Sequence, residues 1–309
     1  MRDGRLLGAV SIERNMETTK KLLAELDEDQ RTLAQHQTPA VHPRGALRYA
    51  LSDLVGSSPK FTAAVMLAHK MAGNESSILL QGETGTGKEI IASGIHAERH
   101  GGRPLPYVTI NCTAIPEQLL ESELFGHEKG AFTGATEARM GKFQLAGDGD
   151  ILLDEIGDMD LQMQSKLLRV LESREFERVG GREIIPLRAG IIASTNQNLL
   201  AMSERRAFRA DLYYRLSTVE IRIPALRERP GDIPLLVSHF ITRENLSIAV
   251  TDEAMEAMTA YRWPGNVREL RNIVQRLGII CRDRPVYAAD VIRYFSEEAP
   301  SPPLFPVLE

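Results

Sequence analysis

Gly82-Glu-Thr-Gly-Thr-Gly-Lys88 is the stretch that decides the fold of this 309-residue chain. The apolar run Ile78–Gln81 precedes it, and a helical pattern from Lys88 to Glu98 follows it. Glycines let backbone N–H groups curl around phosphate oxygens, and the following helix adds its positive N-terminal dipole. The stretch therefore predicts a phosphate-binding loop (P-loop) whose lysine reaches the β- and γ-phosphates of a nucleotide.

Apolar runs and helical patterns alternate on both sides of this loop. The expected strands are Ile78–Gln81, Tyr107–Asn111, Asp150–Asp154, Ala189–Ser194 and Val219–Ile223, with helices at Lys88–Glu98, Gln118–Leu124 and Leu161–Glu172 among them. Strands separated by helices predict an α/β fold with a mostly parallel sheet flanked by helices. The Gly180-Gly181 pair, between 176–179 and 183–185, predicts a hairpin turn.

The pattern changes after Pro224, where the apolar strands stop. Helical segments at 232–245, 251–261, 266–281 and 288–295 predict a small all-helical lid. We therefore assign an α/β core to 51–224 and the lid to 225–297. Residues 1–36 contain a short strand-like run and a charged helix, 37–50 form a linker, and 298–309 form a proline-rich tail that we expect to be extended or disordered.

The composition excludes a mainly disordered, collagen-like or membrane-spanning chain. Apolar residues make up 43% and charged residues 26% of the chain, as in ordinary globular proteins. The net charge of −5 does not imply non-specific affinity for nucleic acid. No apolar run is long enough for a membrane helix and no secretory signal is evident, so we expect a cytoplasmic protein. Two cysteines, Cys112 and Cys281, cannot form a disulfide framework and are expected to be free thiols.

Two acids end the third apolar run, at Asp154 and Glu155. Ligands of open α/β sheets bind at the carboxyl ends of the strands. There Asp154 would hold Mg²⁺ and Glu155 would polarise the attacking water. Mg²⁺ ligation falls to Asp154 because Glu89 stands where a P-loop normally has Ser or Thr after the lysine. The alternative is that the two acids only cap the next helix.

Asparagines end two other expected strands. Asn196 could position the same water or sense the γ-phosphate, and Asn111 could hydrogen-bond Glu155. The alternative for both is a turn residue. His96 and His100 share one helical face, but Glu98 does not complete a HExxH motif and no third ligand is evident, so we expect no zinc there.

These motifs together resemble those of an AAA+ ATPase, and one further motif identifies a narrower family. Gly130-Ala-Phe-Thr-Gly-Ala135 is the GAFTGA signature of sigma-54-dependent transcriptional activators, the bacterial enhancer-binding proteins. Phe208–Leu216 and Trp263-Pro-Gly-Asn-Val-Arg-Glu-Leu270 are similar to two further signatures of that family. The resemblance spans roughly 51–297, and Glu89 fits the family although it departs from the general motif.

The resemblance implies a role for each matching residue. The catalytic set would be Lys88, Asn111, Asp154, Glu155 and the arginine fingers Arg209 and Arg215, with Asn111 restraining Glu155. A salt bridge to Asp211 or Glu204 is the alternative for the arginines. Arg262 and Arg271 are expected to be solvated, whereas Arg268 would touch the nucleotide from the lid. The expected nucleotide contacts are Gly56, Gly82, Glu83, Thr84, Gly85, Thr86, Gly87, Lys88, Glu89, Asn196 and Arg268.

The resemblance also implies the activity and the partners. It implies Mg²⁺-dependent hydrolysis of ATP to ADP and phosphate by a homo-oligomeric ring, a hexamer or heptamer, that remodels the closed complex of sigma-54 RNA polymerase. The partner-binding residues would be Gly130, Ala131, Phe132, Thr133, Gly134 and Ala135, in a mobile surface loop with glycines on both sides. The alternatives are that Phe132 packs into its own core, and that the chain is a regulatory or protein-remodelling AAA+ ATPase that does not act on sigma-54.

Two regions outside the core complete these expectations. Residues 1–36 resemble the last strand of a PAS-type sensor followed by a signalling helix. Family members normally end with a DNA-binding helix-turn-helix, so we expect DNA contact only through a domain that this sequence does not include.

Overall fold

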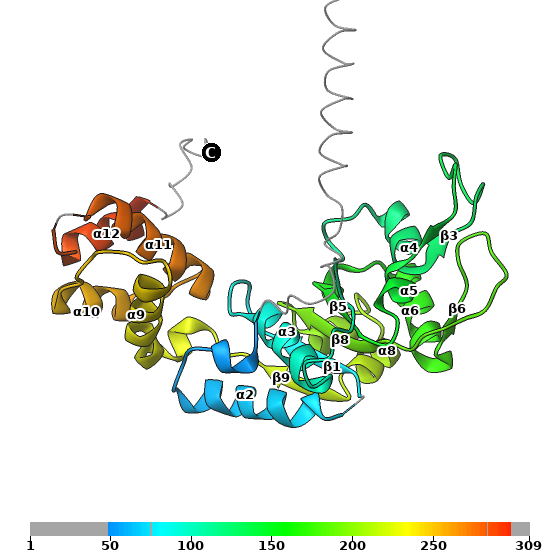
Figure 1. The fold of residues 1–309 in the computed structure, drawn as a ribbon, viewed down its shortest axis with the longest axis horizontal. Helices are drawn as coiled ribbons and strands as arrows, with labels where there is room; N and C mark the ends of the chain where they lie inside the picture. Colours follow the sequence, from blue (N-terminus) through cyan, green and yellow to red (C-terminus); the bar gives the residue numbers. More distant parts are fainter. Residues whose placement is uncertain (1–48, 75, 283, 298–309) are drawn as a thin grey trace, which may run out of the picture. The chain divides into compact units, whose positions relative to one another are not determined.

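A parallel five-stranded sheet is the centre of the computed structural model, which describes residues 49–74, 76–282 and 284–297. The strand order is β2-β5-β8-β1-β9, and every neighbouring pair is parallel (Figure 1). The strands are β1 (Ile78–Gln81), β2 (Tyr107–Asn111), β5 (Asp150–Asp154), β8 (Gly190–Thr195) and β9 (Val219–Arg222). The predicted parallel α/β sheet is confirmed, with shifts of one residue at β8 and β9.

The side chains of the strands alternate between the two faces of the sheet and pack into two separate hydrophobic cores. In β5, Ile151 and Leu153 pack on one face of the sheet and Leu152 packs on the other, and all three are at most 1% exposed. One face is covered by α2 (Pro59–Ala72) and α3 (Lys88–Arg99). The other is covered by α4 (Glu117–Phe125), α5 (Lys142–Ala146), α6 (Leu161–Ser173), α7 (Leu199–Glu204) and α8 (Ala210–Leu216). Burial on both faces explains the consecutive apolar residues of the inner strands β1, β5 and β8, whereas the outer strands β2 and β9 also carry polar residues.

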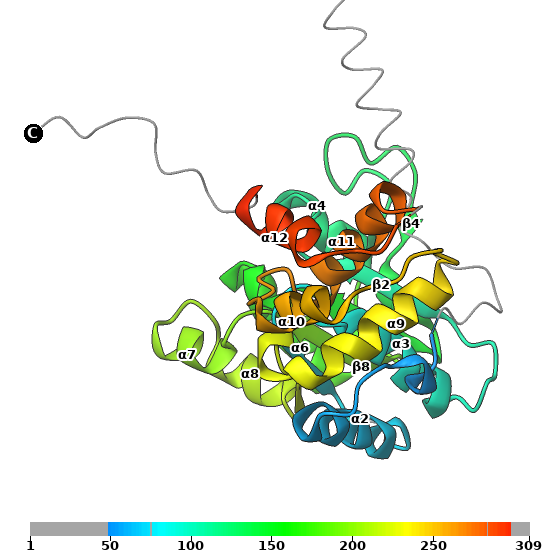
Figure 2. The same cartoon turned by 90° about the vertical axis from the view of Figure 1, so that its left-hand side faces the viewer.

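The chain then builds a helical unit with its own core. It consists of α9 (Ile233–Arg243), α10 (Asp252–Ala260), α11 (Asn266–Ile280) and α12 (Ala288–Glu297) (Figure 2). Trp263 is fully buried among them, and its indole N–H donates to the Met258 carbonyl over 2.8 Å. A buried indole with a satisfied N–H anchors such a core well. The predicted all-helical lid is confirmed.

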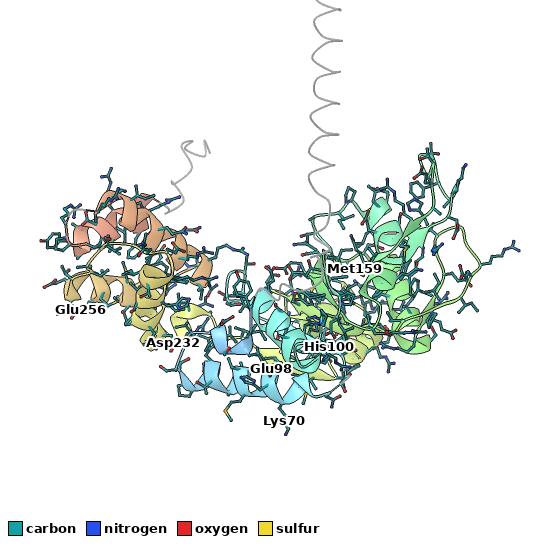
Figure 3. The ribbon with its side chains drawn as sticks, in the orientation of Figure 1. Lys70, Glu98, His100, Met159, Asp232 and Glu256 are labelled. Carbon is teal, nitrogen blue, oxygen red and sulfur yellow. The ribbon has the colours of Figure 1, made fainter. Side chains whose placement is uncertain are left out.

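Two short 3-10 turns, η3 (Leu226–Glu228) and η4 (Pro230–Asp232), lead from β9 into the lid. Asp232, labelled in Figure 3, is fully buried and accepts hydrogen bonds from the backbone N–H groups of Ser57 and Ser58 at 2.7 and 2.9 Å. A carboxylate that accepts two backbone N–H groups forms strong charge-assisted bonds. The start of the lid is therefore tied to the segment that enters α2.

The expected hairpin at Gly180-Gly181 is only partly right. Its strands β6 (Glu175–Phe176) and β7 (Ile185–Pro186) are short, so 177–184 form a longer loop. Gly180 does turn the chain with a φ of 76°. Val179, however, exchanges backbone hydrogen bonds with Gly126 and Glu128, beside the ribbon of β3 (Gly126–His127) and β4 (Arg139–Met140). The backbone of Gly126 and Glu128 therefore pairs with the N–H and C=O groups of Val179 that a tighter hairpin would have paired within itself.

Several expectations concern residues that the structure does not describe. They are the sensor-like strand and helix within 1–36, nearly all of the linker at 37–50, and the tail at 298–309. Within the described part of the chain, no helix combines the length and the apolarity that crossing a bilayer requires.

Candidate active site

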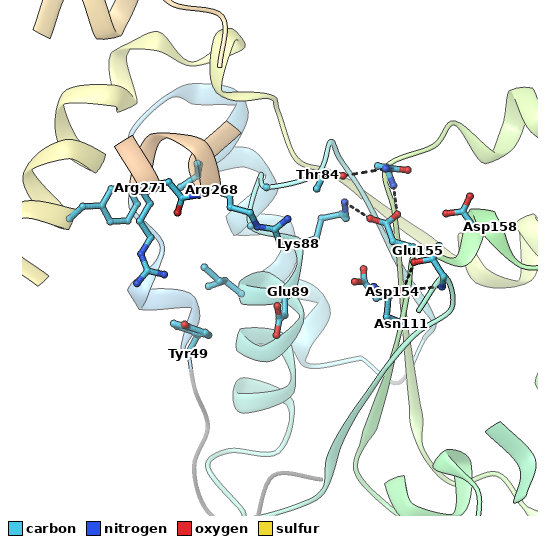
Figure 4. Close-up of a pocket in the computed structure, with 18 of the residues that line it drawn as sticks. Tyr49, Thr84, Lys88, Glu89, Asn111, Asp154, Glu155, Asp158, Arg268 and Arg271 are labelled. Carbon is cyan, nitrogen blue, oxygen red and sulfur yellow. Dashed lines mark hydrogen bonds and ion pairs between the residues drawn. The ribbon is translucent and has the colours of Figure 1, made fainter. Parts of the chain in front are cut away.

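A cavity of about 610 Å³ lies at the carboxyl ends of the strands, where the lid meets the core (Figure 4). The core side includes the P-loop, both acids and both strand-end asparagines that the sequence singled out, and the lid side is rich in arginine. The lining residues are Tyr49, Thr84, Gly85, Gly87, Lys88, Glu89, Ile90, Asn111, Thr113, Asp154, Glu155, Asp158, Asn196, Phe240, Arg243, Val267, Arg268, Arg271 and Asn272. A pocket at the carboxyl ends of the strands is the usual ligand site of an open α/β sheet.

The P-loop joins β1 to α3 in the conformation that its glycines allow. Gly85 and Gly87 have φ values of 82° and 107°, which side chains rarely adopt. A Cβ on Gly85 would lie 2.3 Å from the Gly265 carbonyl oxygen, so this position must be glycine for the lid to approach. The first backbone N–H groups of a helix such as α3 suit an anion, although the N–H of Ile90 already donates to the Gly87 carbonyl over 3.1 Å.

Lys88 is the buried cation of the pocket. Its side chain is 8% exposed, and its ammonium donates to the Gly82 carbonyl over 2.8 Å. It also lies 3.6 Å from Glu155 Oε1. Both partners are oxygen atoms, which the oxygens of a bound phosphate could replace.

Asp154 and Glu155 have different surroundings. A carboxylate oxygen of Asp154 accepts a short hydrogen bond from the Ser194 hydroxyl. Glu155 has a left-handed backbone with φ 52° and ψ 48°, and its Oε2 accepts from the Asn196 backbone N–H over 3.2 Å. A non-glycine residue in this region costs roughly 1–3 kcal/mol and such residues cluster at active sites. Glu155 also occupies the N-cap position of η2 (Ile156–Asp158), but its side chain makes no capping hydrogen bond there, so the alternative of a simple cap is not supported.

The two asparagines lie on the pocket but differ in their contacts. The Asn196 side-chain amide donates to the Thr84 hydroxyl of the P-loop over 3.2 Å. The side-chain oxygen of Asn111, Oδ1, accepts from the backbone N–H of Thr113 over 2.9 Å and from that of Ala114 over 3.2 Å. Among the hydrogen bonds of the described residues, none joins Asn111 to Glu155. The turn-residue alternative therefore describes Asn111, whose restraining role stays a prediction.

The start of α11 is hydrogen-bonded to the P-loop. The backbone N–H groups of Val267 and Arg268 both donate to the Gly85 carbonyl, over 3.0 and 3.3 Å. The buried Asn266 amide donates to Glu83 Oε2 and to the Thr84 carbonyl, each over 3.1 Å. The conformation of the P-loop is thus linked directly to the lid.

Arg227 provides a second link that the sequence did not reveal. Its guanidinium forms two hydrogen bonds with the Glu83 carboxylate. This pairing is the largest cause of a pKa of about 2 for Glu83. Burial acts in the opposite direction and raises the pKa, whereas the hydrogen bond from the Asn266 amide lowers it further. The signals that could have identified these links are the Arg227-Glu-Arg229 run a few residues after the last strand and Asn266 within the Trp263–Leu270 signature.

Arginines of the lid give the cavity a positive wall. Arg268, Arg271 and Arg243 line it, and the Arg243 guanidinium carbon lies 5.6 Å from the centroid of the Tyr49 ring. Arg271 was expected to be only solvated, but it lines the cavity, and its Nε bonds Glu244 over 2.7 Å. Guanidinium groups suit polyphosphate ligands because they donate in pairs. Arg262 is absent from the lining.

Three of the expected nucleotide contacts differ in where they lie relative to the cavity. Glu89 is exposed and lines the cavity. Thr86 is 3% exposed and its hydroxyl donates to the Glu83 carbonyl over 2.7 Å, so it stabilises the loop from inside. Gly56 packs beneath Phe61, where an added Cβ would lie 2.5 Å from the ring, and its neighbours Leu54 and Val55 line a small adjoining cavity.

Arg209 and Arg215 do not line the pocket of their own chain. Arg209 pairs with Asp211 over 2.7 Å, as one alternative anticipated, and also donates to the Ser165 hydroxyl. Arg215 donates to the Leu171 carbonyl at 3.1 and 2.7 Å. Both side chains reach solvent, so either is accessible to a neighbouring molecule.

The segment 130–135 forms a closed loop away from the cavity. Gly130 and Gly134 have φ values of 80° and 104°, and the Gly130 N–H donates to the Ala135 carbonyl over 2.8 Å. Phe132 is 39% exposed, and its ring meets His127 edge-on with centroids 5.1 Å apart. The alternative of a Phe132 inside its own core is wrong. The turn at Gly180 supports the loop, because a Cβ there would approach Ala131 to 2.9 Å.

The fold and this pocket define a P-loop nucleotide-binding domain with a helical lid, which is the AAA+ architecture. Comparison with known families gives the narrower assignment. Residues 54–222 match the family described as "Sigma-54 interaction domain", and residues 227–304 match "AAA+ ATPase lid domain". The chain belongs to the family of sigma-54-dependent transcriptional activators.

Curated relatives agree with this assignment. The chain is 46% identical over 265 residues to the Regulatory protein AtoC of Escherichia coli, covering 84% of this chain and 56% of AtoC. It is 47% identical over 237 residues to the Escherichia coli activator HyfR, covering 75% of this chain and 35% of HyfR. It is 44% identical over 262 residues to the Nif-specific regulatory protein of Azotobacter vinelandii, covering 83% and 50%. The chain thus spans between about a third and just over half of these relatives' length.

Solved structures agree with the fold. NtrX from Brucella abortus in complex with ATP superposes with a TM-score of 0.71 at 34% identity, covering 93% of this chain and 64% of NtrX. NtrX in complex with ADP gives a TM-score of 0.70 at 35% identity, covering 91% and 61%. A RuvB mutant from Thermotoga maritima, at 14% identity and a TM-score of 0.54, covers 81% of this chain and 72% of RuvB and shares the fold alone.

Proposed function

We propose that this chain hydrolyses ATP with Mg²⁺ and uses the energy to remodel the closed promoter complex of sigma-54 RNA polymerase through the loop at 130–135. One observation carries the proposal. A pocket with a buried lysine, a strained glutamate and lid arginines coexists with an exposed aromatic loop elsewhere on the same domain. The pocket suits phosphoryl transfer, and the exposed aromatic loop suits contact with a protein partner. The nucleotide-bound NtrX structures support the choice of ligand.

The residues fit ATP and Mg²⁺. The positive φ of Gly87 and the N-terminus of α3 suit phosphate oxygens, and Lys88 and Arg268 add positive charge. Asp154 supplies the hard oxygen that Mg²⁺ prefers, while the Thr86 hydroxyl is already engaged with Glu83. When bound, Mg²⁺ would neutralise charge on the β- and γ-phosphates.

The protein's own groups would then act on a water molecule. The Glu155 carboxylate accepts a proton from the water or polarises it, and the Asn196 N–H holds that carboxylate in place. Phosphate oxygens compete with Glu155 for Lys88, so binding of ATP frees the carboxylate. Arg209 and Arg215 of a neighbouring subunit would neutralise charge on the transferred group, which explains why they do not line their own pocket.

A continuous segment of the chain connects the pocket to the loop at 130–135, which we call the partner loop. Asn111 closes the turn that leads to α4, and α4 runs directly into β3 and the loop. Ser122 of α4 contacts His127 over 2.7 Å, and His127 in turn meets the ring of Phe132. A change near Asn111 and Glu155 can therefore move Phe132 through packed elements.

The test combines assembly with capture. The ring proposal predicts that specific ATPase activity rises with protein concentration over the assembly range, since each site needs two subunits. Purified sigma-54 should be captured in the presence of ADP and a metal fluoride, and Phe132→Ala should lose capture while it keeps hydrolysis. Concentration-dependent hydrolysis without any capture would favour an AAA+ ATPase that acts on another partner.

A further inference from the structure

A buried polar cluster lies at the opposite edge of the sheet from the nucleotide pocket. Asp150 is the first residue of β5, whereas Asp154 is the last, and Asp150 is fully buried. His96 and His100 reach it from the C-terminal end of α3, where Figure 3 labels His100. No third zinc ligand is evident from the sequence around the two histidines, but the fold supplies one that is 50 residues from His100 along the chain.

The donor atoms of the cluster converge. His96 Nδ1 lies 2.7 Å and His100 Nε2 lies 2.8 Å from the same oxygen, Asp150 Oδ2. One ligand atom from each of the three residues falls within 4.8 Å of the others. Ligand atoms around a tetrahedral zinc lie about 3.3 Å apart, since each is about 2 Å from the metal. Small rotations of the side chains would therefore admit the ion.

Arg99 occupies the position of an outer-shell group. Its Nη1 bonds the other carboxylate oxygen, Asp150 Oδ1, and so fixes the orientation of the carboxylate. Its Nε and Nη2 are buried without a hydrogen-bond partner among the described residues. A water or chloride bound to a metal is an acceptor of the kind that these donors lack. The space for the pair depends on Gly190, where a Cβ would lie 2.0 Å from Asp150 Oδ1.

We propose that His96 Nδ1, His100 Nε2 and Asp150 Oδ2 bind a zinc ion. Two imidazoles at i and i+4 of one helix with one carboxylate form a common donor set for zinc, and the fourth ligand is exogenous. The His100 side chain is 11% exposed, which gives the ion a route in. Arg99 opposes a second cation, so we expect an affinity on the order of micromolar rather than that of a four-ligand site.

The consequence is structural. The helix α3 begins at Lys88 and ends at Arg99, so an ion at its C-terminal end fastens the element that carries the P-loop lysine to the central strand β5. The site is independent of the proposed ATPase. Its loss would lower thermal stability and leave the pocket residues in place.

The experiment is a zinc titration of the whole chain, freed of metal by chelation, with millimolar Mg²⁺ present to occupy carboxylate sites. Calorimetry should give one zinc per chain, and Co²⁺ should give the visible absorption of a four-coordinate site. His100→Gln should weaken zinc binding at least about 10-fold, because one of three protein ligands is lost. His69→Gln is the matched control, since His69 is exposed and its ion pair among the described residues is with Glu98, outside the cluster; it should bind zinc as the parent does.

Two outcomes would overturn the proposal. One is equal zinc affinity in the parent and His100→Gln, and the other is no binding below about 100 μM. In either case the two imidazoles act as hydrogen-bond donors to Asp150 only. Asp150→Asn gives a second arm if His100→Gln folds poorly, because the amide keeps the shape of the carboxylate and loses its charge.

Discussion

The ammonium of Lys88 and the carboxylate of Glu155 form an ion pair in the pocket, 3.6 Å apart, although Lys88 begins α3 and Glu155 follows β5. Their side chains are only 8% and 16% exposed, so each is the other's principal charge partner. A polyphosphate ligand would compete for Lys88 and release Glu155. We therefore expect the pair to couple occupancy of the proposed phosphate site to the availability of Glu155 as the proposed base.

Glu155→Gln should separate binding from hydrolysis. The amide cannot accept a proton, so the rate of phosphate release should fall by about 10²–10⁴-fold, while the affinity for a fluorescent ATP analogue stays within a few-fold. Lys88→Ala should instead lose affinity. Asp148→Asn, an exposed acid outside the pocket, is the control for both. Wild-type hydrolysis in Glu155→Gln would remove this residue from the mechanism.

Arg209→Ala should reduce hydrolysis by about 10³-fold or more without changing nucleotide affinity, since the arginine is predicted to act on a neighbouring subunit. Mixing tests the trans arrangement. Arg209→Ala keeps its own pocket and Lys88→Ala keeps its arginines, so a mixture of the two should recover part of the activity that neither has alone. No recovery would contradict a shared site. Arg188→Ala, an exposed arginine paired with Asp148, should behave as the parent.

Thr133→Ala should spare hydrolysis and abolish formation of the open promoter complex. Thr133 is exposed in the partner loop, remote from the cavity lining, so its loss should affect only the coupling step. Thr136→Ala, exposed just beyond the loop, is the matched control. Loss of hydrolysis together with promoter opening would contradict a dedicated coupling role.

Glu83 should contribute a pH-dependent share of stability. Arg227 lowers its pKa from 4.5 to about 2, so the folded state favours the charged form. This stabilisation is present above pH 4.5 and is lost as pH falls from about 4.5 to about 2. Because the Glu83 side chain is 42% exposed, we expect no more than about 1 kcal/mol. Denaturant unfolding of the parent and Glu83→Gln should differ near pH 6 and converge as pH falls; a constant difference would contradict the assignment.

Cys112 should resist alkylation in the folded protein. Burial, and then the nearby Asp154 charge, raises the pKa of its thiol to about 12, so almost no thiolate exists at pH 8. Iodoacetamide should label Cys112 only after denaturation, as mass spectrometry of peptides can show. Rapid labelling of the native protein would mean that the region next to Asn111 opens.

The sequence by itself determined the parallel sheet, the P-loop and the acids at the strand end, because each depends on local patterns: apolar runs bounded by turns, glycine spacing, and polar residues where a strand stops. Tertiary structure alone decided which distant groups meet. Arg227 pairs with Glu83 across 144 positions, and Asp150 joins His96 across 54. Such pairs leave no periodic signal, since one charged residue resembles another until the strands and the lid fix their positions. Hydrogen-bond competition also escaped prediction, and for that reason Asn111 bonds its own turn and Val179 bonds the backbone beside β3.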